Sequence, residues 1–127
     1  MDKIGLAVVD ISTYEEWFSP QYWINYNTGS YWLVSDGKVL EWANKLDDSF
    51  SAQGNIITNN IGWDDEQGIY SVFSQIPDGV ALSQVSAKYA EKFGDLRTRI
   101  NDLSQDEVQT IAGILGSKPP FRVAETA

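Results

Sequence analysis

The segment VALSQVSAKYAEKFGDLRTRINDL, residues 80–103, carries the clearest periodic pattern in the chain. Its apolar residues recur at steps of three and four, the spacing that lines side chains along one face of an α-helix. They are Leu82, Val85, Tyr89, Phe93, Leu96, Ile100 and Leu103. Charged residues from Lys88 onward occupy the opposite side. The pattern predicts one long surface helix, bent near Gly94, whose apolar face packs on the aromatic-rich chain before it.

A second helix is predicted directly after the first. Ser104 and Glu107 have the spacing of a capping box, and Gly116 is placed to end the helix. Its apolar side is formed by Val108, Ile111, Ala112 and Leu115. The two helices are therefore expected to form a hairpin. Two prolines then prevent a further helical turn, so residues 118–127 are expected to be an extended tail outside a single domain of residues 1–117.

The first 76 residues contain runs of aromatic and β-branched residues, which favour strands. Strands are predicted at residues 4–11, 22–26, 31–35, 38–42, 55–61 and 69–76, with a short helix at 13–18. The fold class expected is α+β, an antiparallel sheet of about five strands packed against the C-terminal helical hairpin. One alternative stays open, because Val39, Trp42, Ala43 and Leu46 also fit a helix over residues 38–46.

The predicted turns set the register of residues 22–42 and so the two faces of the sheet. Ile24, Leu33 and Leu40 fall on the face toward the core. The other face presents Trp23 and Trp32, with Asn25 and Glu41 beside them. Aromatic anchors among polar groups are enriched at protein interfaces, whereas packing inside the fold is the simpler explanation of so many aromatic residues.

Several classes of site lack their usual residues. The 127 residues include no Cys and no His, which excludes disulfides, thiolate nucleophiles and the common zinc sites. No catalytic, cofactor-binding or metal-ligating residue is therefore assigned, and the protein is expected not to be an enzyme. The N-terminal apolar run, residues 4–9, is shorter than a signal-peptide core or a membrane span, so a cytoplasmic protein without a membrane partner is expected.

The net charge of −9 is concentrated in one part of the chain. Residues 1–79 contain twelve acidic residues against three lysines, which accounts for all of it, and they also contain all five tryptophans. Such a surface repels nucleic acid and attracts basic proteins or cations. The bases of residues 88–99 alternate with acids, which is typical of a solvated helix face rather than a nucleic-acid site.

The acidic pairs are interpreted as contact residues rather than as a reactive or cation-binding site. Neighbours in sequence do not supply the carboxylate separation of a glycosidase, and their order does not match a calcium-binding loop. The predicted partner-binding surface comprises Trp23, Asn25, Trp32, Glu41, Asp47, Asp48, Trp63, Asp64, Asp65 and Glu66.

Three functional hypotheses follow. The leading one is a small acidic binding protein that inhibits or sequesters a basic protein or nucleoprotein, in the manner of an immunity protein or a phage anti-defence inhibitor of a nuclease. The second is a module that binds a carbohydrate or another small polar ligand through exposed tryptophans. The third is a phage or other structural subunit that forms homo-oligomers.

Overall fold

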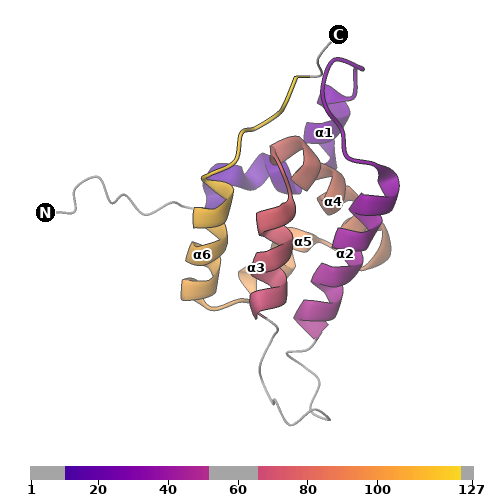
Figure 1. Ribbon diagram of the computed structural model, residues 1–127. Coiled ribbons are helices and arrows are strands. Elements are labelled where there is room, and N and C mark those ends of the chain that lie inside the picture. The colour runs from indigo at the N-terminus through magenta and orange to yellow at the C-terminus, as the bar shows by residue number, and fades with distance from the viewer. Residues whose placement is uncertain (1–10, 52–65, 124–127) are drawn as a thin grey trace, which may run out of the picture.

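The computed structural model describes residues 11–51 and 66–123, and within these ranges the protein is all-helical (Figure 1). In chain order the elements are the 3-10 helix η1 (Ile11–Phe18) and the α-helices α1 (Pro20–Tyr26), α2 (Asp36–Ser51), α3 (Glu66–Gln75), α4 (Gly79–Lys92), α5 (Leu96–Asn101) and α6 (Gln105–Leu115). Within the described ranges β pairing is confined to one isolated bridge between Tyr31 and Val123. The predicted α+β fold with its five-stranded sheet is therefore wrong.

The strand predicted at residues 22–26 is part of helix α1. The Ser19 hydroxyl accepts the backbone N–H of Gln21 at 3.2 Å, and Pro20 occupies the first turn, where its missing N–H is not needed. Tyr22 and Tyr26, four residues apart, meet edge to face with ring centroids 5.0 Å apart. The aromatic content is typical of a strand. The Ser-Pro start and the contact between tyrosines four residues apart favour the helix that forms.

Helix α2 replaces the strand predicted at residues 38–42, and the alternative helix over residues 38–46 is confirmed. Asp36 and Gly37, expected to form a hairpin turn, instead open this helix, and the Asp36 carboxylate complements the positive end of the helix dipole. The helix buries the four residues that fitted the helical period: Val39, Trp42, Ala43 and Leu46. Residues 31–35, which were also predicted to be a strand, form the end of the connection between α1 and α2.

Helix α3 replaces the strand predicted at residues 69–76. Ile69, Val72, Phe73 and Ile76 are all at most 1% exposed, and their spacing of three and four places them on one helix face. The same sequence also alternates, which is why it was interpreted as a strand. The short helix predicted at residues 13–18 is confirmed within η1. The strand predicted at residues 4–11 lies outside the described residues except for Ile11, which begins η1, and the strand at residues 55–61 lies entirely outside them.

Helix α4 is the centre of the molecule rather than a surface helix. It packs against η1, α1, α2 and α5, and it buries every residue from Gly79 to Ser86 together with Tyr89. The solvent-facing side predicted for residues 80–103 begins only in its last turns. The predicted bend is confirmed, because α4 ends at Lys92, Gly94 just after it is left-handed (φ 113°), and Asp95 then caps α5. The C-terminal part is thus three helices, not a two-helix hairpin.

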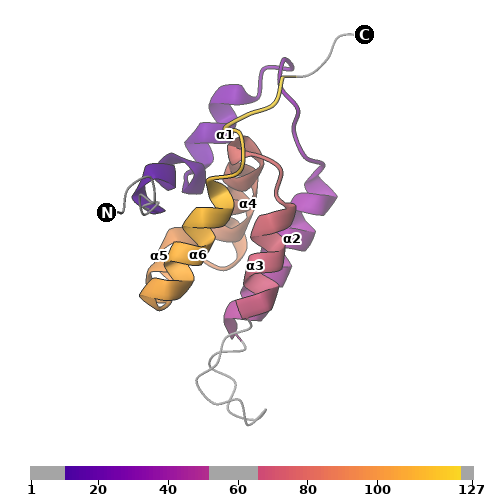
Figure 2. The same cartoon turned by 60° about the vertical axis from the view of Figure 1, so that its left-hand side comes forward.

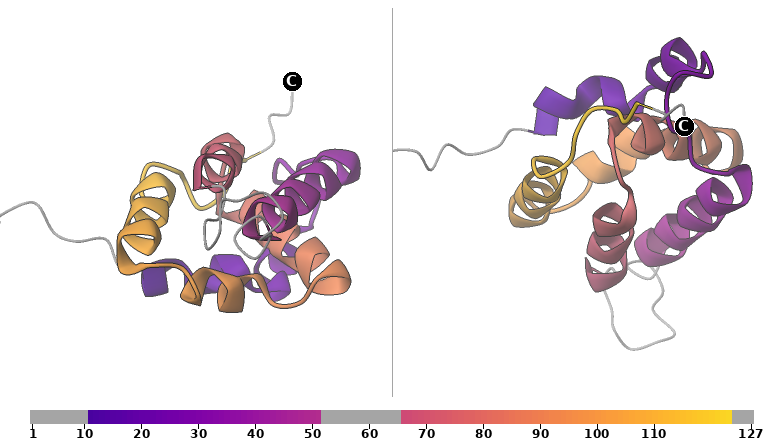
Figure 3. Two further views of the ribbon diagram at one scale, coloured as in Figure 1. Left: turned by 90° about the horizontal axis from the view of Figure 1, so that it is seen from below. Right: turned by 45° about the horizontal axis from the view of Figure 1, so that its top comes forward.

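Helix α6 begins with the predicted capping box. The Ser104 hydroxyl accepts the N–H of Glu107 at 3.2 Å, and the Glu107 carboxylate accepts the N–H of Ser104 at 2.9 Å. The helix packs on α3 and η1, and α3 lies between α6 and α2 in Figure 1. Figure 2 shows α6 beside α5 from a second side. Seen from below in Figure 3, α6, α3 and α2 form one arc, with η1 and α4 on its other side.

The C-terminal strap, residues 117–123, closes the start of α4. The N–H groups of Gly79 and Val80 donate to the carbonyls of Pro119 and Pro120, both at 3.0 Å. The fully buried Asp78 accepts the N–H of Ala81 at 2.7 Å and forms an ion pair with Arg122 of the strap, also at 2.7 Å. The strap therefore supplies partners for donors that the first turn of a helix leaves unsatisfied.

Candidate functional site

A cleft opens where α1, α2 and α4 meet. Its volume is about 100 Å³, and the residues that line it are Trp23 from α1, Asp36 and Val39 from α2, and Gln84, Ala87, Lys88 and Glu91 from α4. We call it the Trp23 cleft. Three helices that are separate in the sequence contribute to it, so it exists only in the folded chain.

Ser83 of α4 fixes the α1 side of the cleft. Its hydroxyl accepts the backbone N–H of Trp23 at 2.9 Å and donates to the carbonyl of Ser19 at the start of the same helix. Both capacities of one buried hydroxyl are used. Helix α1 is thereby held against α4, and Trp23 is held at the edge of the cleft.

Gln84 fixes the α2 side. Its side-chain carbonyl accepts the N–H of Val34 at 3.0 Å, and its amide group donates to the carbonyl of Val34 at 2.9 Å. The amide therefore binds the chain just before α2 as a neighbouring strand would. Asp36, two residues after Val34, is placed at the rim of the cleft by this pair of bonds.

Three charged groups surround the opening. The ammonium group of Lys88 lies 3.8 Å from a carboxylate oxygen of Asp36 and 3.5 Å from one of Glu91. Both separations exceed the roughly 2.7–2.9 Å of a strong charge-assisted hydrogen bond. The Asp36 side chain is 87% exposed, so its pairing with Lys88 is weak. Two carboxylates and one ammonium leave the rim with an excess negative charge.

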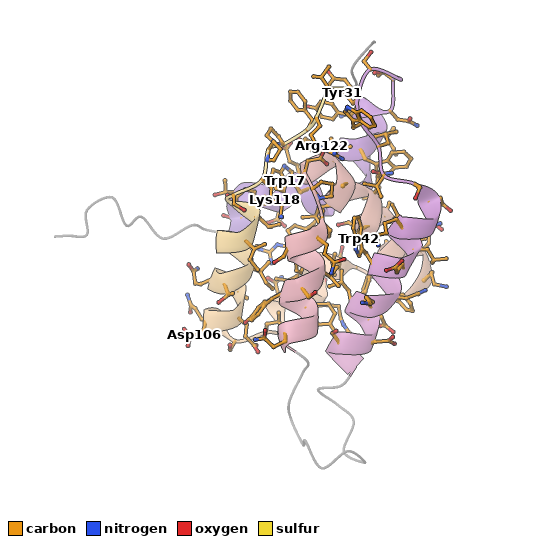
Figure 4. The ribbon with its side chains drawn as sticks, in the orientation of Figure 1. Trp17, Tyr31, Trp42, Asp106, Lys118 and Arg122 are labelled. Atoms are coloured by element: carbon orange, nitrogen blue, oxygen red, sulfur yellow. The ribbon has the colours of Figure 1, made fainter. Side chains whose placement is uncertain are left out.

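The indole N–H of Trp23 is buried and has no hydrogen-bond partner among the residues that the structure describes. Leaving such a donor unpaired costs about 1–3 kcal/mol. The buried Trp42 on α2 behaves differently, because its indole N–H donates to the side-chain carbonyl of Gln75 on α3 at 3.2 Å. Figure 4 shows Trp42 between these two helices. Native folds rarely leave a buried donor unpaired, which makes Trp23 the most informative residue of the cleft.

The cleft is too small for most free ligands. A cavity of about 150 Å³ is needed to hold benzene, and sites for small molecules usually measure about 300–1,000 Å³. A volume of about 100 Å³ suits one side chain of a larger partner.

The other predicted contact residues are distributed over several elements. Asn25 is exposed on α1 and accepts a hydrogen bond from Gln21 at 2.9 Å. Trp32 is 49% exposed on the connection to α2. On α2, Glu41 forms an exposed ion pair with Lys38 at 3.3 Å, and Asp48 is exposed. The structure therefore does not assemble these four residues on one sheet face.

Asp47 serves the fold. It accepts a hydrogen bond from the buried Tyr89 hydroxyl at 3.5 Å and lies 3.9 Å from Arg99. Trp63, Asp64 and Asp65 lie outside the described residues, and Glu66 is the first residue of α3.

Sequence reasoning identified Trp23 but missed Asp36, Gln84, Lys88 and Glu91 as its neighbours. Lys88 and Glu91 were assigned to a solvated helix face. One available signal was the polar residues Ser83, Gln84 and Ser86, which interrupt the most apolar part of residues 80–103. Buried polar side chains need specific partners, so they mark the places where other segments attach.

Burial shifts the pKa of groups in the core and at the strap. Burial raises the pKa of Tyr89 to about 12 and raises that of Tyr22 further. Burial also lowers the pKa of Lys118 in the strap, whose ammonium group donates to the carbonyl of Ser74 at 2.8 Å. These shifts follow from packing in the core and at the strap.

Comparison with protein-family models, with curated proteins and with solved structures found no match to this chain. In the described ranges, no group of three or more acidic side chains is arranged to hold a metal ion. Among the helices of those ranges, none has the length and apolar character needed to cross a membrane.

Proposed function

We propose that this chain is a non-enzymatic binding protein that inhibits or sequesters a basic macromolecular partner, and that the partner docks at the Trp23 cleft. The observation that carries the proposal is the buried indole N–H of Trp23, which has no partner among the described residues, in a residue that lines the same cleft as the exposed carboxylates of Asp36 and Glu91. A donor left unpaired at a stability cost, next to charges held at long distance, is explained by a partner that completes the site.

The charge of the protein supports a basic partner. A net charge of −9 speeds the encounter with a positive surface and disfavours nucleic acid. A nuclease or a nucleoprotein complex presents such a positive surface. The charge therefore favours an inhibitor of one of these partners. Competition for the basic groove of such a partner requires no chemical step by this chain.

The exposed indole of Trp32 provides a second contact. Trp32 lies two residues before Val34, which Gln84 of the cleft binds, and the backbone N–H of Trp32 donates to the carbonyl of Arg122 in the strap at 2.8 Å. The segment that carries this indole is thus held at both sides. Tryptophans on a fixed backbone are the residues that most often dominate the free energy of an interface.

Affinity capture with the purified chain tests the proposal. The chain is cross-linked to its contacts in extract of the cells that encode it, and the captured proteins are identified. We expect basic proteins whose capture falls as salt is raised, and weaker capture by the double variant Asp36→Asn, Glu91→Gln. Asp106→Asn is the matched control, because Asp106 lies at the far tip of α6 (Figure 4). Capture of neutral or acidic proteins, or capture unchanged in the double variant, would overturn the proposal.

A further inference from the structure

We propose that the group received by the Trp23 cleft is an arginine side chain of the partner, together with a main-chain carbonyl next to it. This inference rests on the proposed function and specifies its ligand. The argument uses the charges at the rim, the indole N–H of Trp23 and the size of the cleft.

Lys88 occupies the arginine position in the free protein. Its ammonium group lies between the carboxylates of Asp36 and Glu91 at 3.8 and 3.5 Å, too far to make a strong bond to either. A guanidinium group is planar and carries five N–H donors, so it can pair with two carboxylates at once, whereas an ammonium group acts as a point charge. An incoming arginine therefore gains bonds that Lys88 does not make, and the flexible lysine moves into solvent.

The movement of Lys88 also gives access to Trp23. The indole N–H of Trp23, a residue that lines the cleft, is closed to solvent, so an acceptor can reach it only after a neighbouring side chain has moved. Lys88 is the lining residue with the longest flexible side chain, and it is held by two weak pairs. In the proposed complex, a carbonyl of the partner backbone then accepts the indole N–H.

The size and charge of the cleft disfavour the other ligand types. The volume of about 100 Å³ is below the roughly 150 Å³ of a cavity that holds benzene, so it leaves room for the planar guanidinium head of an arginine but not for a whole sugar ring or nucleobase. A carboxylate could accept from the indole N–H and from Lys88, but it would meet both Asp36 and Glu91. Arginine is the one common side chain that satisfies both carboxylates and leaves an adjacent carbonyl for Trp23.

A titration followed by the indole N–H resonances in a ¹⁵N–¹H spectrum tests the assignment. The resonance of Trp23 is identified by its loss in Trp23→Phe. The probes are the capped peptides acetyl-Gly-Arg-Gly-amide, its citrulline analogue, which has the same shape without the charge, and analogues with lysine or glutamate in place of arginine. We expect the arginine peptide to shift the Trp23 resonance and to bind about tenfold more tightly than the citrulline peptide, because one charged hydrogen-bonding group is worth about that factor.

Two lysine variants on the same helix sharpen the test. Lys88→Met removes the competing cation, so the affinity for the arginine peptide should rise about threefold. Lys92→Met removes the same charge outside the cleft, where Lys92 lies over the ring of Phe93, and should leave the affinity unchanged. Circular dichroism of each variant establishes that it is folded.

The outcomes separate this inference from the proposed function. Equal binding of the arginine and citrulline peptides, preference for glutamate, or weaker arginine binding in Lys88→Met would overturn the arginine assignment. If one of these results is obtained while the natural chain still captures basic proteins, the proposed function stands and only the arginine assignment is wrong. If the natural chain captures no basic protein either, the proposed function and the arginine assignment are both rejected.

Discussion

The polar groups near the two ends of helix α4 differ in how completely they are paired within the fold. At its start, the buried Asp78 has two partners at 2.7 Å, and the hydroxyls of Ser83 and Ser86 bind the carbonyls of Ser19 and Trp17. Toward its end, Lys88 makes two long ion pairs and lines the same cleft as Trp23, whose indole N–H has no partner in the described part of the chain. Folding alone completes the first set of interactions. The described residues leave the second set incomplete, which is why we attribute the start of α4 to stability and propose a binding role for the Trp23 cleft.

The start of α4 should be disrupted most severely by Gly79→Ala. A Cβ at this position would overlap the indole of Trp17, which is only 5% exposed and cannot move away freely. We expect a loss of about 3 kcal/mol in the free energy of unfolding, from overpacking of the core. Urea unfolding measures it.

The matched control is Gly113→Ala on α6. This glycine is also helical, and an added Cβ meets nothing within 4 Å. Its replacement should stabilise the protein by about 0.5–1 kcal/mol, because alanine is the better helix former. Equal effects of the two substitutions would show that the contact between α4 and Trp17 is not tight.

The next largest effect is expected from Asp78→Ala. The substitution removes the buried cap of α4 and leaves Arg122 of the strap without its counter-charge. We expect a loss of about 2–3 kcal/mol, the sum of a lost cap and a lost charged hydrogen bond. Asp95→Ala, which removes the exposed cap of α5, should cost only about 1 kcal/mol. Identical costs at the two caps would mean that the strap adds nothing to the start of α4.

Alkaline pH should weaken the core through Tyr89. Its hydroxyl ionises near pH 10 in the unfolded chain, whereas burial raises its pKa to about 12 in the folded protein. The unfolded chain therefore loses this proton first, so the stabilising contribution is complete below pH 10 and is lost between about pH 10 and 12. The loss is on the order of 2 kcal/mol.

Tyr89→Phe keeps the ring and removes the ionisable group. Urea unfolding at pH 9, 10 and 11 should show a shallower decline for this variant than for the natural chain. Some decline will persist, because burial also raises the pKa of Tyr22. The interpretation fails if both proteins lose stability at the same rate with pH.

The helical structure after residue 79 could be predicted in part from local signals, although one helix was expected where α4 and α5 form. Ser104 with Glu107, and Gly94 followed by Asp95, specify where helices start and end within a few residues. Such signals are satisfied by neighbouring atoms in the chain and do not depend on the rest of the fold.

The earlier helices could not be assigned reliably, because two periods coexist in their sequences. Residues 69–76 alternate as a strand does and also repeat at three and four. Residues 22–26 combine aromatic content typical of strands with a Ser-Pro helix start. Burial against other helices determines whether the strand period or the helix period is realised, and the local sequence does not contain that information.

The candidate site was predictable only in part. The indole of Trp23 could be proposed as a contact residue from its type and its polar neighbours. The residues that surround it come from α2 and α4, far along the chain, and their association depends on Ser83 and Gln84 binding the backbone of other segments. A fold predicted as a sheet could not place Asp36 and Lys88 beside Trp23.

The most direct test of the central claim compares two tryptophan substitutions in urea unfolding. One of them, Trp23→Phe, has the smallest expected change in stability. Trp42→Phe removes a buried hydrogen bond to Gln75 and should cost about 2 kcal/mol. Trp23→Phe also shrinks a ring, but it relieves the cost of a donor that the described residues leave unpaired, and this relief offsets the lost ring contacts, so the free energy of unfolding should stay within about 0.5 kcal/mol of the natural value. A cost at Trp23 equal to that at Trp42 would show that its indole N–H already serves the fold, and would contradict its assignment to a binding site.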